Sequence, residues 1–409
     1  MALKDNFLKH GSIIFFFSVV GYLSGYLFHA YMGRVLGPED YGILGSLIAI
    51  LSIATIPVGA VQIVIANFTS KLKSEKEFGK IKGLLVRSFR KMFVYGFFVF
   101  ILLAALSTLA AGFLNIPSAV PIIVIGISII FSFVSPVNFG VLQGLQNFKS
   151  LGLGQSLVFV LRLAFGVLLV SWGLGINGAA LAFSVSSALV ILFTLVPLRG
   201  IMKQRMSRDI DAPAIYKYYW SVLLVFMGFT LIMNIDVILA KHFFTAEQAG
   251  YYAAAAVLSK IAFFLSGIIT TVMFPKAVEM HSAKSSARPI LKKGLLYMVL
   301  LLALLVSSYI AIPGFIVSFF FGSGYLESAT LIGLLAMAMS FLAVSNIIAF
   351  YNMSVSRMGF VYILLAFALA EIPLLFLFHS TMMEFVWVIF CSMAGLLAAM
   401  AAYIIKSGQ

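Results

Sequence analysis

The chain has 409 residues, of which 63% are hydrophobic and only 10% charged, and its formal net charge is +14 at pH 7. A mean hydropathy of +1.12 lies far outside the range of water-soluble domains, whereas a lipid bilayer accommodates such a chain. The positive charge does not indicate a nucleic-acid partner, because basic residues confined to connections between apolar spans are explained by membrane topology.

The first predicted element is a transmembrane helix over residues 11–32, preceded by Lys4 and Lys9. This apolar run is too long for the core of a signal peptide and lacks a small-residue cleavage site, so we expect it to be retained. It ends at a polar segment, GRVLGPEDYG (Gly33–Gly42), which we interpret as a turn on the way to the second helix.

Apolar segments of about twenty residues, each long enough for one crossing, continue to the end of the chain. With the first, they predict twelve transmembrane helices, at 11–32, 43–66, 92–113, 118–141, 152–172, 178–198, 218–240, 250–273, 294–316, 328–350, 359–379 and 383–404. No connection between them is long enough to hold a soluble domain. The predicted fold class is therefore an all-α polytopic membrane protein.

The basic residues lie almost entirely on one side of these predicted helices. Of the 27 Lys and Arg residues, only Arg34 and Lys241 fall on the other side, and Arg162 and Lys260 fall inside helices. Positively charged connections stay in the cytoplasm. We therefore expect a multi-pass protein of the plasma or inner membrane with both termini cytoplasmic.

The second half of the chain repeats the first. Gly42 and Gly250 are 208 positions apart, and SFVSPVN (132–138) and SFLAVSN (340–346) keep this offset. The repeat predicts two domains, 1–205 and 206–409, each a six-helix bundle. An even number of crossings inserts both copies in the same orientation, so we expect two pseudo-symmetric bundles around a central cavity, related by an axis along the membrane normal.

Four ionisable residues lie within predicted helices: Arg162, Asp236, Lys260 and Glu371. Each costs roughly 2.5–3.5 kcal/mol at the centre of a lipid-facing helix, so each should face a partner or a cavity. One interpretation is charge neutralisation, of Asp236 by Lys260 and of Arg162 by Glu371. The other is a cavity whose cations, Arg162 and Lys260, bind an anionic phosphate group, while the acids Asp236 and Glu371 bind a coupling cation or act in gating. The two interpretations are compatible if the substrate displaces an acid.

Polar residues that carry no charge, and the two outer cations, complete the candidate site. Asn138, Asn234 and Asn346 lie within or beside predicted helices, where buried amides either bind substrate or join neighbouring helices by hydrogen bonds. Arg34 and Lys241 are candidates for gating at the outer mouth of the cavity.

Nothing in the sequence indicates catalysis. The five histidines show no metal-binding spacing, and no phosphate-binding GxxxxGK[ST] loop is present. We therefore expect no catalytic residue, no metal and no cofactor. Membrane polysaccharide polymerases or ligases usually carry a sizeable outer loop with catalytic residues, so the short outer connections here make that alternative the less favoured one.

Three segments carry a resemblance to a known family. GRVLGPEDYGILGSL after the first helix, EQAGYYAAA after the seventh and FFFGSGYLESA (Phe319–Ala329) are similar to polysaccharide biosynthesis proteins. These are the Wzx-type flippases of the multidrug/oligosaccharidyl-lipid/polysaccharide exporter superfamily. Fourteen-helix relatives carry a further helix pair, for which no apolar segments are evident in this sequence, so we expect a twelve-helix protein instead.

The resemblance implies a flippase that moves a polyprenyl-(pyro)phosphate-linked oligosaccharide from the cytoplasmic to the outer leaflet by alternating access, for the assembly of cell-surface polysaccharide. It also implies coupling to H⁺ or Na⁺, contact with membrane lipids, and polysaccharide assembly enzymes as candidate partners. The main alternative is a cation-coupled antiporter of drugs or small molecules in the same superfamily. Acids should dominate the cavity of such an antiporter, whereas the deepest charges here are cations.

Overall fold

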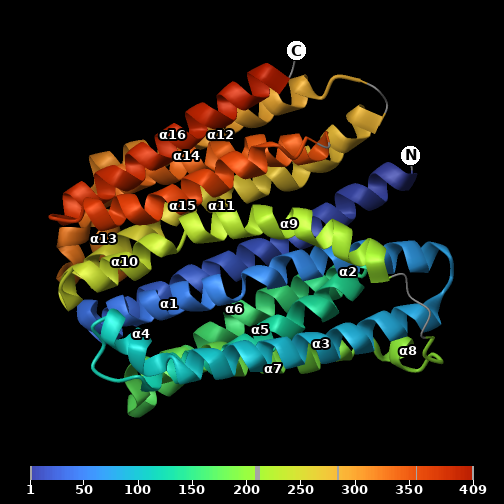
Figure 1. Ribbon diagram of the computed structural model, residues 1–409, viewed down its shortest axis with the longest axis horizontal. Coiled ribbons are helices and arrows are strands. Elements are labelled where there is room, and N and C mark those ends of the chain that lie inside the picture. The colour runs from blue at the N-terminus through green and yellow to red at the C-terminus, as the bar shows by residue number, and fades with distance from the viewer. Residues whose placement is uncertain (1, 208–211, 283–284, 356, 408–409) are drawn as a thin grey trace. The chain divides into compact units, whose positions relative to one another are not determined.

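The computed structural model describes residues 2–207, 212–282, 285–355 and 357–407, and every regular element in these ranges is helical (Figure 1). Residues 208–211 and 283–284, which belong to two of the predicted basic connections, lie outside the described residues. The first half contains α1 (Ala2–Ala54), α2 (Ile56–Ser74), α3 (Phe78–Ala105), α4 (Ser107–Phe113), α5 (Val120–Gly144), α6 (Phe148–Leu169), the π-helix η1 (Val170–Leu174), α7 (Gly175–Leu195) and α8 (Arg199–Met202). The second half contains α9 (Ala212–Ile232), α10 (Ile235–Phe243), α11 (Ala246–Ser282), α12 (Arg288–Ala311), α13 (Pro313–Phe321), the 3₁₀-helix η2 (Ser323–Ser328), α14 (Ala329–Ser354), α15 (Phe360–Leu377) and α16 (Met382–Ser407).

Ten stretches among the described residues are long and apolar enough to cross a membrane. Two of them are too long for a single crossing: Phe15–Ala54 and Phe148–Leu195 each contain two helices joined through non-helical glycines. When these two are counted as pairs, the number of crossings agrees with the twelve predicted from the sequence. The predicted all-α membrane fold is confirmed.

The chain forms two compact units. Unit 1 comprises Met1–Leu36 and Ile43–Thr230, and unit 2 comprises Gly37–Gly42 and Leu231–Gln409. The predicted division into 1–205 and 206–409 follows the repeat of the sequence rather than this packing, and it stays a prediction.

Each unit is built around one central helix. In unit 1, α5 packs against α2, α3, α6 and α7, and in unit 2, α14 packs against α11, α12 and α16. These two helices contain the most completely buried apolar stretches of the chain, whereas α3 exposes most of its apolar stretch. A helix that is apolar on all sides and exposed is suited to contact with lipid.

The repeat is visible in the bounds of the elements. Adding 208 to residues 38–74, which run from the middle of α1 to the end of α2, gives the range of α11, Ala246–Ser282. The same offset relates α3 to α12, α5 to α14 and α7 to α16 within a few residues at each end. The order and lengths of the helices therefore repeat along the chain, as the sequence predicts.

The segment Gly33–Gly42 is not the loop that we expected. It is helical throughout except at Gly37, whose φ of 76° and ψ of 172° are accessible to glycine but not to residues with a Cβ atom. Pro38 begins the next helix, where its missing N–H removes no hydrogen bond, and Glu39 and Asp40 follow in the first turn, where acidic side chains are favoured. One glycine therefore replaces the turn.

The predicted connection over 67–91 is also largely helical, because α2 continues to Ser74 and α3 begins at Phe78. Lys80, Lys82 and Arg87 lie on α3 rather than in a loop. Hydropathy identifies only the apolar part of a helix. Where the first turns of a helix are basic and extend beyond the bilayer, those turns are therefore mistaken for a connection.

The first helix of the second repeat is broken where that of the first is continuous. Asn234 has φ −135° and ψ −21° and separates α9 from α10, whereas the equivalent position in α1 is helical. Discontinuous helices at membrane depth are accepted where the irregular backbone is buried in protein or lines a cavity. This break places Asp236 in the first turn of α10.

Candidate functional site

Two buried acids lie together in unit 2. Asp236, in the first turn of α10, is 1% exposed, and Glu371, in the middle of α15, is fully buried. The two carboxyl groups are close enough to interact electrostatically, and α10 packs against α15. Neither helix alone would place two acids at one point; the pair is a product of tertiary packing.

Tyr252 of α11 completes this cluster. Its hydroxyl donates a hydrogen bond to Asp236 Oδ2 with an O–O distance of 2.6 Å, and its ring is fully buried against Phe385. This distance is within the usual range for a hydrogen bond between a hydroxyl and a carboxyl oxygen. It fixes the orientation of the Asp236 carboxyl group.

Both oxygens of Glu371 are buried without a hydrogen-bond partner. Asp236 Oδ1 accepts no hydrogen bond of good geometry, although the backbone N–H groups of Asp236 and Val237 lie close to its carboxyl group. Burying an ionised carboxylate without a partner is strongly unfavourable, and orphaned buried polar atoms in native structures commonly mark a missing ion or water. The arrangement is chemically suited to hold a proton or a small cation.

Lys260 of α11 lies near Asp236 but does not form a direct ion pair with it. The two interact electrostatically, yet the ion pairs within 4 Å among the described residues do not include them. Within unit 2, both carboxyl oxygens of Glu371 are buried without a hydrogen-bond partner. A direct ion pair between Asp236 and Lys260 is therefore not seen, whereas the pairing of Arg162 with Glu371 stays a prediction.

Arg162, the deep cation of unit 1, is held by aromatic rings. Its Cζ atom lies 3.8 Å from the ring centroid of Phe183 on α7 and 5.3 Å from that of Phe159 on α6. Its Nε is buried without a hydrogen-bond partner. Cation–π contact stabilises the guanidinium at this depth while leaving its N–H donors available to an anion.

Glycines of α1 provide space for the aromatic rings that surround Arg162. A Cβ atom on Gly21 or Gly25 would come within 3.3 Å of the Phe159 ring. Phe28, one turn further along α1, makes an edge-to-face contact with Phe183, with ring centroids 5.6 Å apart. Glycines one turn apart on α1 thus allow a phenylalanine of α6 to approach and support Arg162.

Two of the three candidate amides are engaged between helices. Asn138 donates to Thr194 Oγ1 at 2.9 Å, which joins α5 to α7, and Asn346 donates to Ser266 Oγ at 2.8 Å, which joins α14 to α11. Both are buried. Asn234 occupies the break before α10 and makes no side-chain cap there. These contacts support a role for Asn138 and Asn346 in joining helices. A role in binding substrate stays a prediction for all three asparagines.

The two outer cations differ in their surroundings. Arg34 is exposed in unit 1, whereas Lys241, in unit 2, is 2% exposed and lies within electrostatic reach of Glu39. Glu247 accepts a hydrogen bond from Tyr251. The gating role of both residues remains a prediction. Because Lys241 is buried, its ammonium group could reach solvent only if the surrounding helices moved apart.

Sequence reasoning did not identify Tyr252, Phe159 or Phe183. Tyr252 stands in the EQAGYYAAA segment, and a tyrosine one hairpin away from a membrane-embedded acid is a signal that could have suggested it. The two phenylalanines carry no such signal among 40 in the chain. Among the described residues, no group of three or more His, Cys, Asp or Glu side chains is arranged to hold a metal ion.

The sequence and the fold are similar to those of known membrane proteins. The sequence model of the family described as "Polysaccharide biosynthesis protein" matches residues 31–330. An uncharacterized membrane protein of Methanocaldococcus jannaschii is 24% identical over 364 residues, which cover 84% of each chain. Among solved structures, an inward-facing multidrug resistance MATE family transporter of the MOP superfamily is similar with a TM-score of 0.76 and 13% identity, over 94% of this chain and 93% of that one. The lipid II flippase MurJ, in an inward closed conformation, is similar with a TM-score of 0.75 and 13% identity, over 97% of this chain and 88% of that one.

Proposed function

The chain belongs to the polysaccharide biosynthesis protein family, and on this premise we propose that it is a flippase for a polyprenyl-(pyro)phosphate-linked oligosaccharide. Its family and fold are those of membrane transporters and flippases, not of catalysts. The headgroup would cross from the cytoplasmic to the outer leaflet by alternating access, while the lipid tail stays in the bilayer.

The observation that carries this proposal is Arg162. A guanidinium deep in a membrane span, stacked on Phe183 and with Nε unpartnered, is receptive to an anion. Planar guanidinium groups match the geometry of phosphate oxygens better than any other side chain. A charged side chain within a membrane span is energetically unfavourable, and a role in binding a phosphate-bearing substrate accounts for its presence. Lys260 is the second candidate contact.

The acids of unit 2 suit the coupling step. We expect the cluster of Asp236, Glu371 and Tyr252 to bind the coupling ion, H⁺ or Na⁺, because two carboxyl groups are buried together and neither oxygen of Glu371 has a partner. Occupied and empty states of such a cluster differ in charge by one unit in a low-dielectric site, which is enough to bias a conformational equilibrium.

The second candidate function is a cation-coupled antiporter of drugs or small molecules. It is favoured by the likeness in fold to the MATE family transporter and by the same acid cluster. A cationic drug would, however, be repelled by Arg162. A membrane polymerase or ligase is less favoured still.

We also expect the protein in the plasma or inner membrane with both termini cytoplasmic, since the basic residues are concentrated on one side. Enzymes that assemble polysaccharide would supply and use its substrate.

The proposal is tested in proteoliposomes with a fluorescent lipid-linked oligosaccharide, whose accessibility at the far leaflet is followed by quenching. Protein-dependent translocation is expected, with empty liposomes and the Arg162→Ala variant as controls. If no such lipid moves while a cationic dye is exchanged for H⁺ or Na⁺, the flippase proposal fails and the antiporter replaces it.

A further inference from the structure

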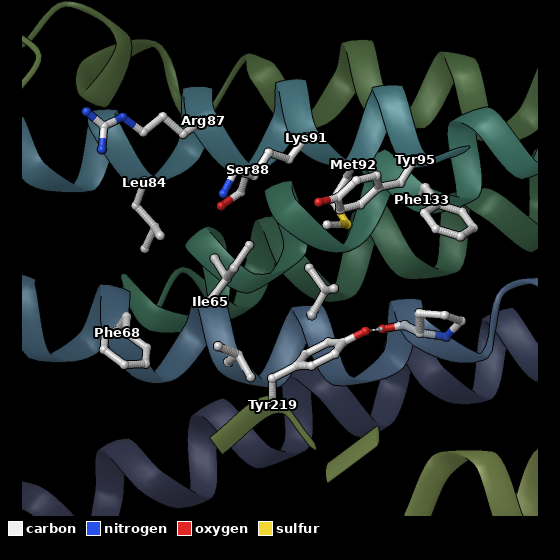
Figure 2. A pocket seen from close by; sticks show the side chains of 13 residues that line it. Ile65, Phe68, Leu84, Arg87, Ser88, Lys91, Met92, Tyr95, Phe133 and Tyr219 are labelled. Carbon is white, nitrogen blue, oxygen red and sulfur yellow. Dashed lines mark hydrogen bonds between the residues drawn. The ribbon is translucent and has the colours of Figure 1, made fainter. Parts of the chain in front are cut away.

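Unit 1 contains a pocket of about 240 Å³ that the transport proposal does not use (Figure 2). Its walls come from α2, α3, α5 and the start of α9. The thirteen lining residues are Pro57, Val61, Val64, Ile65, Phe68, Leu84, Arg87, Ser88, Lys91, Met92, Tyr95, Phe133 and Tyr219. Most of this surface is apolar, and the cations are both on α3.

The pocket lies between two helical stripes. On α3, Leu84, Arg87, Ser88, Lys91 and Tyr95 follow one another at helical spacing along one side of the pocket, as Figure 2 shows. The other side is an apolar stripe of α2. Both helices pack mainly on α5 and only slightly on each other, which leaves the groove between them.

The stripe of α3 changes character along its length. After Leu84 it carries the cations Arg87 and Lys91, and beyond Tyr95 the same side of the helix continues with Phe98 and Leu102, which are 66% and 49% exposed. From Lys91 to Leu102 the helix rises about 16 Å, close to the ~15 Å depth of the hydrocarbon in one leaflet. A cationic end followed by an exposed apolar track of this length matches a phosphate headgroup and its acyl chain.

We propose that this groove binds one anionic phospholipid of the bilayer, with the phosphate at Arg87 and Lys91 and an acyl chain along Tyr95 and Phe98. A free anion would not use the apolar walls, and a zwitterionic lipid would not use two cations. The ligand is a resident of the membrane rather than the transported substrate.

Binding there would connect three helices. The hydroxyl of Tyr219, near the start of α9, donates to the carbonyl oxygen of Pro57, at the start of α2, with an O–O distance of 3.2 Å; the dashed line in Figure 2 marks this contact. The α9 helix leads to the break at Asn234. A lipid wedged between α2, α3 and Tyr219 therefore stabilises the start of the helix that leads to the acid cluster.

The test uses the purified full-length protein in detergent, titrated with phosphatidylglycerol or phosphatidylcholine. Bound lipid is counted by native mass spectrometry, and thermal stability is followed by intrinsic fluorescence. We expect phosphatidylglycerol to bind more tightly and to raise Tm. Arg87→Ala and Lys91→Ala should each weaken its binding by roughly fivefold, the effect of one cation near an anionic surface.

Arg90→Ala is the matched control, because Arg90 is an exposed cation on the same helix that does not line the pocket. If Arg90→Ala weakens binding as much as the other two, the attraction is that of a basic surface and the proposal is wrong. Met92→Trp keeps every charge and fills the groove. Unchanged selectivity for phosphatidylglycerol in this variant would also overturn the proposal, as would equal stabilisation by inorganic phosphate or stabilisation by polyprenyl phosphate alone.

Discussion

Gly42 and Gly250, which occupy equivalent positions of the two repeats, pack backbone against backbone. A Cβ atom on Gly42 would lie 2.8 Å from the amide nitrogen of Gly250, and one on Gly250 would overlap the carbonyl oxygen of Pro38. Close approach of two helices at glycines is a recurring mode of association in membranes. Here the same glycine of the ancestral unit serves on both sides of the contact.

Gly250→Ala should therefore destabilise the protein, because the new methyl group meets backbone that cannot move aside cheaply. Overpacking of this kind costs about 1–3 kcal/mol, which a lower Tm of the purified protein would reveal. Gly267→Ala is the control on the same helix, since a Cβ atom there meets nothing within 4 Å. Its Tm should be unchanged or higher, because alanine is the better helix former. A Tm for Gly250→Ala at or above that of the wild type would contradict the packing described.

Arg162→Ala should slow translocation of the lipid-linked oligosaccharide by roughly 10–100-fold, as expected for loss of a charge-assisted contact of about 1.5–3 kcal/mol. Arg162→Lys keeps the charge but not the planar stacking and should be intermediate. Membrane level and Tm separate this effect from misfolding. Wild-type rates in a folded Arg162→Ala protein would remove the cation from the transport site.

Asp236→Asn and Glu371→Gln should each abolish the dependence of transport on an H⁺ or Na⁺ gradient, because each removes one carboxylate of the buried pair. Tyr252→Phe removes only one hydrogen bond, worth about 1 kcal/mol, and should weaken ion dependence by about fivefold. Transport is measured with each gradient imposed separately. Glu384→Gln is the control, since this acid of unit 2 lies at the surface and binds the backbone of Ser380; it should behave as the wild type.

Asn346→Ala should lower Tm without altering transport, because its amide joins α14 to α11 through Ser266. Interhelical hydrogen bonds in membranes average about 0.6 kcal/mol, so the change is small, and the double variant with Ser266→Ala should be no worse. Loss of transport at unchanged Tm would instead identify Asn346 as a substrate ligand.

The number of helices and their duplication could be predicted from the sequence. Both patterns are visible in a single chain: apolar runs of similar length, and an offset that recurs at glycines and polar residues. Helix ends could not. The basic first turns of α3 are polar, so Lys80 and Arg87 resemble a loop although their backbone is helical. The kink at Gly37 depends on one backbone angle that composition does not reveal.

The charged members of the site could likewise be found from the cost of placing them in a membrane. Their partners could not, since Tyr252 and Phe183 reach Asp236 and Arg162 only through tertiary packing across separate helices. Direct pairing of Asp236 with Lys260, one of the two interpretations of the sequence, is not seen for a related reason. Helix packing positions Lys260 near Asp236 without bringing the two groups into contact.

The assignment of Gly37–Gly42 to unit 2 has a consequence for biosynthesis. This segment leaves the ribosome long before Gly250, and the buried ring of Tyr41 meets Phe321 and Tyr325 only when most of the chain has been made. The first helical hairpin must therefore enter the membrane with its tip unassembled and wait for the second repeat. The first six helices alone would leave the ring of Tyr41 without these two aromatic contacts.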